Sequence, residues 1–378
     1  MRVSPLLLLL ACSEPAAPPK LAEPVVEKPP KAIVQEPAPA PLRHAKLGAP
    51  ANGCAIELEQ RLGAGTRGVA LKDGIVVASD DALTLWQLAD AFREGPHIKL
   101  DAPVAKASAV CASDCQLAWI DQKMRLFHTR LDGAPAKELA RGVDRRFAPA
   151  LALQGDRTLI AFTTTVDEVM HTKLLGVRGD KLEPTQDVTP EGHGATAPTF
   201  LLGASPTLIA IDAHGGISPL LELPLDGTGK PRASLVRTPV SQPFEPPQLA
   251  AVQWSSGEAE AFFTVIGKLA MTAIGRVPLR RPETIDALSP SRGYGELSFA
   301  VARGPRRTLF AYEVPVASTP KAERKLELAL SDGARTDPGP SFEAPALAPS
   351  LARTPGGYLL AYTRADQVHG ALLRCADE

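Results

Sequence analysis

PALALQGDRTLIAFTTTVDEVMHTKLLGV, residues 149–177, contains three short apolar runs joined by two polar turns. The runs are rich in aliphatic and β-branched residues, have the length of strands, and show no sustained period of 3.6 residues. The tripeptides GDR and VDE between them supply turn-forming residues. The segment therefore predicts an antiparallel unit of short strands rather than helices.

The second run of this segment recurs along the chain. In each copy an alanine follows aliphatic or aromatic residues, at intervals of 40 to 51 residues: Ala78, Ala118, Ala161, Ala210, Ala261, Ala311 and Ala361. Repeats of this length mark units that cannot bury an apolar face alone. A fourth, weaker strand precedes the next unit, as at 97–102 and 234–239. Four strands in each of seven units predict an all-β, seven-bladed β-propeller. A β-sandwich is the alternative, but it would not explain the register.

The two ends of the repeat region are predicted to meet. The last unit supplies three strands, and the segment CAIELEQ at 54–60 precedes the first unit. If this segment pairs antiparallel with the third strand, Cys54 lies beside Cys375, close enough for a disulfide. We therefore expect residues 51–378 to form one propeller whose last blade is closed by an N-terminal strand.

A second cysteine pair, Cys111 and Cys115, flanks the turn between two strands of the second unit. A disulfide that clamps this hairpin is the favoured interpretation. A redox or metal-binding dithiol is the alternative, but metal sites need more ligands and no histidine cluster accompanies the pair. This assignment leaves Cys12 without a partner.

The leader MRVSPLLLLLAC, residues 1–12, resembles the signal peptide of bacterial lipoproteins, with Leu9, Leu10 and Ala11 before Cys12. The resemblance implies cleavage after residue 11, lipid attachment at Cys12, and a lipid-anchored location in the cell envelope. Ser13 follows the cysteine, which by analogy favours the outer membrane, facing the periplasm or the surface. The apolar run of about nine residues is too short to span a bilayer. A cleaved secretory leader is the alternative.

Residues 12–50 are rich in proline and alanine and contain no aromatic residue. Such a segment cannot bury enough apolar surface to fold, so it is predicted to be an extended, semi-rigid tether. A proline-motif docking site is the alternative. The rest of the chain has the composition of one large secreted domain, which we expect to be monomeric.

Charge and motifs exclude several functions. Lys and Arg total 41 against 42 Asp and Glu, so no basic face for a nucleic-acid partner is predicted. The seven histidines are dispersed, and neither HExxH, GxSxG nor a phosphate-binding loop occurs. The sequence therefore predicts no metal site, no cofactor and no catalytic residue, and leaves enzymatic activity uncertain.

Two segments, PALALQGDRTLIAF at 149–162 and PSLARTPGGYLLAY at 349–362, resemble the repeats of TolB-type propellers, whose pattern is P-x-W-S-P-D-G-x-x-I-A-F. The proline, the glycine and the apolar-alanine-aromatic ending match, whereas the tryptophan and the Ser-Pro-Asp are missing. The resemblance implies the blade architecture only, and does not extend to the TolB partner.

Propellers usually bind ligands at the face that carries the loops between blades and the turns between second and third strands. Here the relevant loops are at 141–147, 188–197, 238–247, 289–296 and 340–345. Loops on a rigid scaffold are where binding residues concentrate. The candidate ligand face consists of Arg145, Arg146, Glu191, His193, Phe244, Glu245, Arg292, Tyr294, Phe342 and Glu343.

Three functions are compatible with this reading. A non-catalytic envelope lipoprotein that binds an unknown protein or peptide is favoured, because it needs no special residues. A glycan or cell-wall hydrolase or lyase would use Glu191, Glu245 and Glu343 as acid and base, with His193 as another proton carrier. A passive structural envelope protein is the third.

Overall fold

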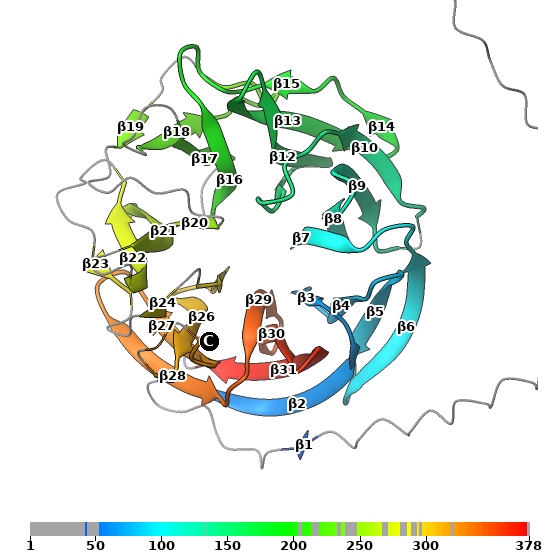
Figure 1. The fold of residues 1–378 in the computed structure, drawn as a ribbon, viewed down its shortest axis with the longest axis vertical. Helices are drawn as coiled ribbons and strands as arrows, with labels where there is room; N and C mark the ends of the chain where they lie inside the picture. Colours follow the sequence, from blue (N-terminus) through cyan, green and yellow to red (C-terminus); the bar gives the residue numbers. More distant parts are fainter. Residues whose placement is uncertain are drawn as a thin grey trace, which may run out of the picture. The chain divides into compact units, whose positions relative to one another are not determined.

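The computed structural model describes the repeat region and a short stretch before it. The described residues are 42–43, 53–132, 134–202, 206–213, 219–232, 236–238, 248–266, 271–279, 286–288, 293–294, 297–317, 319 and 321–375. The predicted signal peptide, Cys12 and the predicted tether lie outside them, apart from Leu42 and Arg43. Among these residues every element of regular secondary structure is a β-strand. The sheets are arranged around a common centre (Figure 1).

Four sheets each correspond to one sequence unit, with strands in chain order from the centre outward. The first contains β3 (Arg67–Ala70), β4 (Gly74–Ala78), β5 (Ala82–Leu88) and β6 (Phe92–Lys99). The second contains β7 (Val104–Cys111), β8 (Cys115–Asp121), β9 (Arg125–Arg130) and β10 (Lys137–Arg141). The third contains β11 (Ala150–Gln154), β12 (Arg157–Val166), β13 (Val169–Arg178), β14 (Lys181–Leu182) and β15 (Gln186–Asp187). The sheet of the sixth sequence unit contains β25 (Phe299–Arg303), β26 (Thr308–Pro315), β27 (Arg324–Ser331) and β28 (Thr336–Phe342).

The fourth and fifth sequence units share a single nine-stranded sheet. Its strands are β16 (Ala195–Leu202), β17 (Thr207–Asp212), β18 (Leu220–Pro224), β19 (Val236–Thr238), β20 (Leu249–Gln253), β21 (Ala259–Ile266), β22 (Met271–Pro278), β23 (Asp286–Ala287) and β24 (Gly293–Tyr294). The innermost strands β16 and β20 pair in parallel, with Leu201 opposite Ala251 and Leu202 opposite Val252.

The prediction of seven blades is therefore wrong, because the structure has six sheets. The register of β16 on β17 shifts between Thr196 and Thr199, and a shift of this kind bends a strand and increases its twist. Beyond this shift, the end of β16 reaches β20 and forms backbone hydrogen bonds with it. The repeat pattern reports side-chain burial and contains no signal for this backbone pairing.

The closing sheet contains β1 (Leu42–Arg43), β2 (Cys54–Ala64), β29 (Leu347–Thr354), β30 (Gly357–Arg364) and β31 (Gln367–Cys375). As predicted, β2 pairs antiparallel with β31, Cys54 stands opposite Cys375, and the two form a disulfide. The two-residue strand β1, which falls within the predicted tether, pairs with the other edge of β2. Segments from the two ends of the repeat region thus share one sheet.

The seven alanines of the repeat are all fully buried, at 0% exposure. Their small size lets neighbouring sheets approach closely. Gly68 on β3 shows how close: a Cβ added there would lie 2.7 Å from the Cβ of Ala361 on β30. Larger side chains at such points would force the sheets apart, since protein interiors are close-packed. The alanine register therefore follows from packing between sheets.

Candidate binding site in the central channel

The inner strands enclose two cavities of about 700 Å³ and about 240 Å³. The residues that line both are Ala70, Ala109, Val301 and Leu351, which belong to β3, β7, β25 and β29. Because they share these four residues, the two cavities are consecutive levels of one central channel. Figure 1 shows β3, β7 and β29 lying around the common centre.

The wide level of the channel opens on the face that carries the turns between first and second strands, which we call the hairpin face. Its lining includes Lys72, Ala112, Gly304 and Pro355, all residues of those turns. The narrow level is lined by residues at or before the start of inner strands, such as Arg67, Ala148 and Ser298. It therefore lies toward the opposite face, which carries the loops that we predicted to bind a ligand.

The channel is basic. Among the described residues, five cationic side chains line it: Arg67 and Lys106 at the narrow level, and Lys72, Arg303 and Arg353 at the wide level. Within the same described lining no aspartate or glutamate occurs. Enclosure by the channel walls lowers the pKa of Arg67 through desolvation. The side chain stays charged at neutral pH, because arginine does not lose its proton in proteins.

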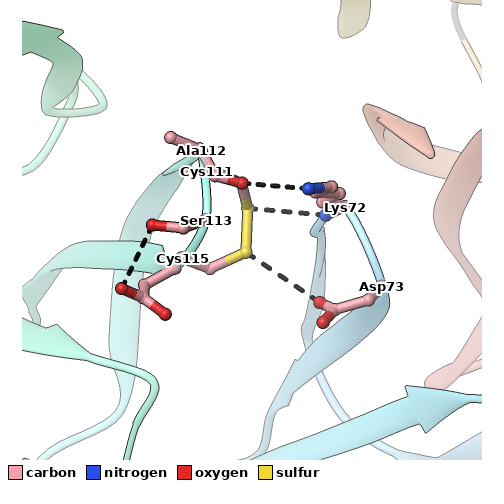
Figure 2. Close-up of a disulfide and its surroundings, with 7 residues drawn as sticks. Lys72, Asp73, Cys111, Ala112, Ser113 and Cys115 are labelled. Atoms are coloured by element: carbon pink, nitrogen blue, oxygen red, sulfur yellow. Dashed lines mark hydrogen bonds between the residues drawn. A yellow bond between two sulfur atoms is a disulfide. The ribbon is translucent and has the colours of Figure 1, made fainter. Parts of the chain in front are cut away.

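The second disulfide clamps the rim of the wide level (Figure 2). Cys111 and Cys115 are bonded across the turn 112–114, so the predicted hairpin clamp is confirmed. The backbone N–H of Lys72 donates to Cys111 Sγ at 3.4 Å, and Lys72 Nζ donates to the carbonyl oxygen of Ala112 at 3.1 Å. On the other sulfur, Cys115 Sγ lies 4.0 Å from Asp73 Oδ1. The clamp thus connects the first two sheets at the channel mouth.

Two arginines of the predicted ligand face are held by neighbours on their own face. Arg145 donates to Gln122 Oε1 at 2.9 Å. Arg146 forms an ion pair with Asp144, with Nη2 2.7 Å from Oδ2, and its guanidinium lies over the ring of Phe147. Burial would raise the pKa of Asp144, but the hydrogen bonds from Arg146 outweigh it and lower that pKa.

His193, another member of that face, forms a buried polar contact. Its Nδ1 lies 2.6 Å from Oδ2 of Asp212, a carboxylate with 1% side-chain exposure. The other oxygen of Asp212 accepts a hydrogen bond from the N–H of Gly194 at 3.2 Å. These contacts fix the loop where it enters β16. They explain the position of His193 without a ligand.

The remaining predicted residues do not form a cluster with it. Phe342 belongs to the core instead of the surface, with 2% exposure and its ring centroid 5.0 Å from that of Tyr362. Glu191 and Glu343 are exposed and precede β16 and β29, which lie across the ring from each other (Figure 1). Phe244, Glu245, Arg292 and the side chain of Tyr294 lie outside the described residues. None of the ten lines the described channel.

Sequence reasoning missed the channel residues. Arg67, Lys106, Arg303 and Arg353 are dispersed along the chain and match no motif. What they share is a place on an inner strand, and the inner strands β3, β7, β25 and β29 contain no aspartate or glutamate. Comparing charge only at the first strand of each unit could have revealed the pattern.

No protein-family model and no curated protein matches the chain. Solved structures match it in fold. The β-propeller domain of Cps50 (Swd1) from Myceliophteria thermophila is 14% identical, with a TM-score of 0.53 over 84% of this chain and 99% of that chain. A polysaccharide lyase of family PL25, an ulvan lyase bound to -[GlcA(1-4)Rha3S]-, is 9% identical, with a TM-score of 0.53 over 83% and 96%.

The WD40 domain of Neurospora crassa Pan2 is 8% identical, with a TM-score of 0.49 over 82% of this chain and 89% of that chain. At such identities the two matches with TM-scores of 0.53 establish the β-propeller fold of this chain and nothing beyond the fold. The lipoprotein leader and the likeness to TolB-type blades stay predictions.

Two negative findings apply to the described residues only. No group of three or more His, Cys, Asp or Glu side chains there is arranged to hold a metal ion. In the same part of the chain, no helix has the length and hydropathy needed to cross a bilayer.

Proposed function

We propose that this protein is a non-catalytic binding scaffold, held at the cell envelope by a lipid on Cys12, whose channel receives a protein or peptide partner. The observation that carries the proposal is the cavity of about 700 Å³ at the hairpin face. Binding pockets commonly have volumes of about 300 to 1,000 Å³. The cavity is therefore large enough for a short peptide segment.

The lining of this cavity combines apolar and polar contacts. Leu202 on β16 lines it with 36% of its surface exposed, so a partner could bury this leucine and gain hydrophobic free energy. Lys72, Arg303 and Arg353 line the same cavity. Converging polar groups of this kind fix the orientation of a bound partner.

The two disulfides support the proposal because they limit movement of the scaffold. Cys54–Cys375 joins the ends of the ring, and Cys111–Cys115 clamps the channel rim. A preorganised site loses less conformational entropy on binding. The proposed tether would add reach, since 38 residues of polyproline II at about 3.1 Å each extend on the order of 100 Å from a membrane surface.

The proposal is tested in the protein's own host with the mature, lipid-anchored chain. We would crosslink living cells and identify copurifying proteins by mass spectrometry, comparing wild type with Leu202→Trp, which fills the channel. The matched control is Val316→Trp, because Val316 is 53% exposed and follows β26 on the opposite face.

A partner captured by wild type and by Val316→Trp but lost from Leu202→Trp supports the proposal. Equal capture by all three excludes the channel as the binding site, and capture of nothing by wild type argues against a scaffold. Replacing Arg145 and His193 in parallel tests the predicted ligand face. Fractionation of a Cys12→Ala variant tests the anchor, since the protein should then leave the membrane fraction.

A further inference from the structure

The arginines of the channel differ from those elsewhere in the propeller. Buried or half-buried arginines outside it have carboxylate partners: Arg276 Nε lies 2.8 Å from Glu260 Oε2, and Arg324 Nη1 lies 2.7 Å from Glu313 Oε2. In contrast, no ion pair or hydrogen bond within the described part of the chain reaches the guanidinium groups of the half-buried Arg67 and Arg303, or of Arg353, which is exposed at the channel mouth.

Charges of one sign that lie close together repel one another, most strongly where solvent screens them least, as at the half-buried Arg67 and Arg303. Arg303 and Arg353 line the same wide cavity, and Arg67 shares the narrow level with Lys106. An anion that enters the channel relieves this repulsion and forms charge-assisted hydrogen bonds, which are about twice as strong as neutral ones. The arrangement therefore favours an anionic occupant, with contacts at both levels.

The walls indicate what kind of anion fits. Each of the strands β3, β7, β25 and β29 pairs with one other strand only. Side chains occupy part of two open edges, since Ala70 N–H donates to Ser350 Oγ and the backbone of Phe299 bonds the Gln248 amide. The other backbone groups on these edges can bond an extended peptide. Nucleobases are held by stacking on aromatic side chains, and no aromatic residue occurs in the described lining of either level. Strand edges beside guanidinium groups match a polypeptide with carboxylate side chains.

We propose that the channel binds an extended peptide segment rich in aspartate or glutamate, inserted from the hairpin face. Its carboxylates pair with Arg303 and Arg353 at the wide level and with Arg67 at the narrow level. This inference rests on the proposed function and names the chemistry of the partner. The chain's own tether is a poor occupant, because residues 13–50 contain five Lys and Arg against four Glu.

The test uses the purified mature chain and fluorescein-labelled hexaglutamate, with hexaglutamine of equal length as the neutral probe. Fluorescence anisotropy compares wild type, Arg303→Gln/Arg353→Gln, Arg67→Gln and the charge-retaining Arg303→Lys/Arg353→Lys. Arg306→Gln is the matched control, because Arg306 is exposed in the turn after β25 and lines neither cavity. Thermal unfolding checks that each variant is folded.

We expect hexaglutamate to bind and hexaglutamine not to bind. Loss of a charge-assisted hydrogen bond costs about 1.5 kcal/mol or more, about tenfold in affinity. Binding should therefore weaken about tenfold in Arg67→Gln and about 100-fold in Arg303→Gln/Arg353→Gln. It should change little in Arg306→Gln, stay near wild type in the double lysine variant, and weaken between 50 and 300 mM salt because ions screen the charges.

Several outcomes overturn the inference: no binding of hexaglutamate, equal binding by Arg303→Gln/Arg353→Gln, or tighter binding of inorganic triphosphate or a sulfated tetrasaccharide than of hexaglutamate. In-cell crosslinking separates this failure from failure of the scaffold proposal. Loss of the partner from Leu202→Trp but not from Arg303→Gln/Arg353→Gln retains the scaffold and refutes the acidic peptide. No loss from either variant refutes the channel as the site.

Discussion

Replacing both cysteines of the closing disulfide with alanine should destabilise the propeller far more than replacing both cysteines of the hairpin disulfide. Cys54 and Cys375 are 321 positions apart in the sequence, whereas Cys111 and Cys115 are 4 apart. In the chain-entropy model the stabilisation grows with the logarithm of loop length, giving about 6 kcal/mol for the first disulfide and about 2 kcal/mol for the second.

The β2–β31 pairing should survive the loss of the closing disulfide, because nine residue pairs join these strands. Equilibrium urea unfolding, followed by the fluorescence of the buried Trp119 and Trp254, measures both effects. With an m-value of about 3 kcal/mol per molar urea, the midpoint should fall by about 2 M for Cys54→Ala/Cys375→Ala and by less than 1 M for Cys111→Ala/Cys115→Ala. Equal shifts for the two variants would refute the loop-entropy argument.

Two further predictions concern buried charge. Burial lowers the pKa of His128 to about 4, and its Nε2 lies 2.9 Å from Gln116 Oε1. The unfolded state therefore takes up this proton near pH 6.5 while the folded state does not, and stability should fall between pH 6.5 and 4. Urea unfolding at pH 7.5 and 5.5 should show that this group lowers the free energy of unfolding by about 1 kcal/mol at the lower pH. His128→Asn should abolish this pH-dependent loss. If the loss is the same size in His128→Asn, His128 is not its source. Glu260→Ala should cost about 3 to 5 kcal/mol, because it leaves Arg276 half-buried without its carboxylate. Glu57→Ala, which breaks the exposed pair with Arg374, should cost less than about 1 kcal/mol, and similar losses for both variants would contradict this reasoning.

The sequence predicted the parts of the fold that depend on side-chain size and spacing. The buried alanines recur because neighbouring sheets approach closely there, as Gly68 and Ala361 show. The cysteines at 54 and 375 indicated closure because antiparallel pairing brings strand ends together.

The errors arose where backbone geometry decides. Parallel pairing at Leu201 and Leu202 depends on the bend in β16, which no residue pattern specifies. Phe342 ends β28, whose sequence TDPGPSF is rich in turn-forming residues. The sequence therefore predicts a loop there, although Phe342 packs in the core. The channel cations were missed because their convergence exists only after the ring closes.

The position of β2 also determines the order of assembly. During synthesis β2 is made long before its main partner β31, because Cys54 and Cys375 are 321 positions apart. At roughly 5 to 20 residues per second, the edge of β2 that pairs with β31 stays without that partner for about 15 to 60 seconds. A nascent chain therefore holds an open strand edge through most of its translation, and such edges recruit other strands. The ring can close only after β31 has been synthesised, and until then the open edge of β2 has to avoid pairing with strands of other chains.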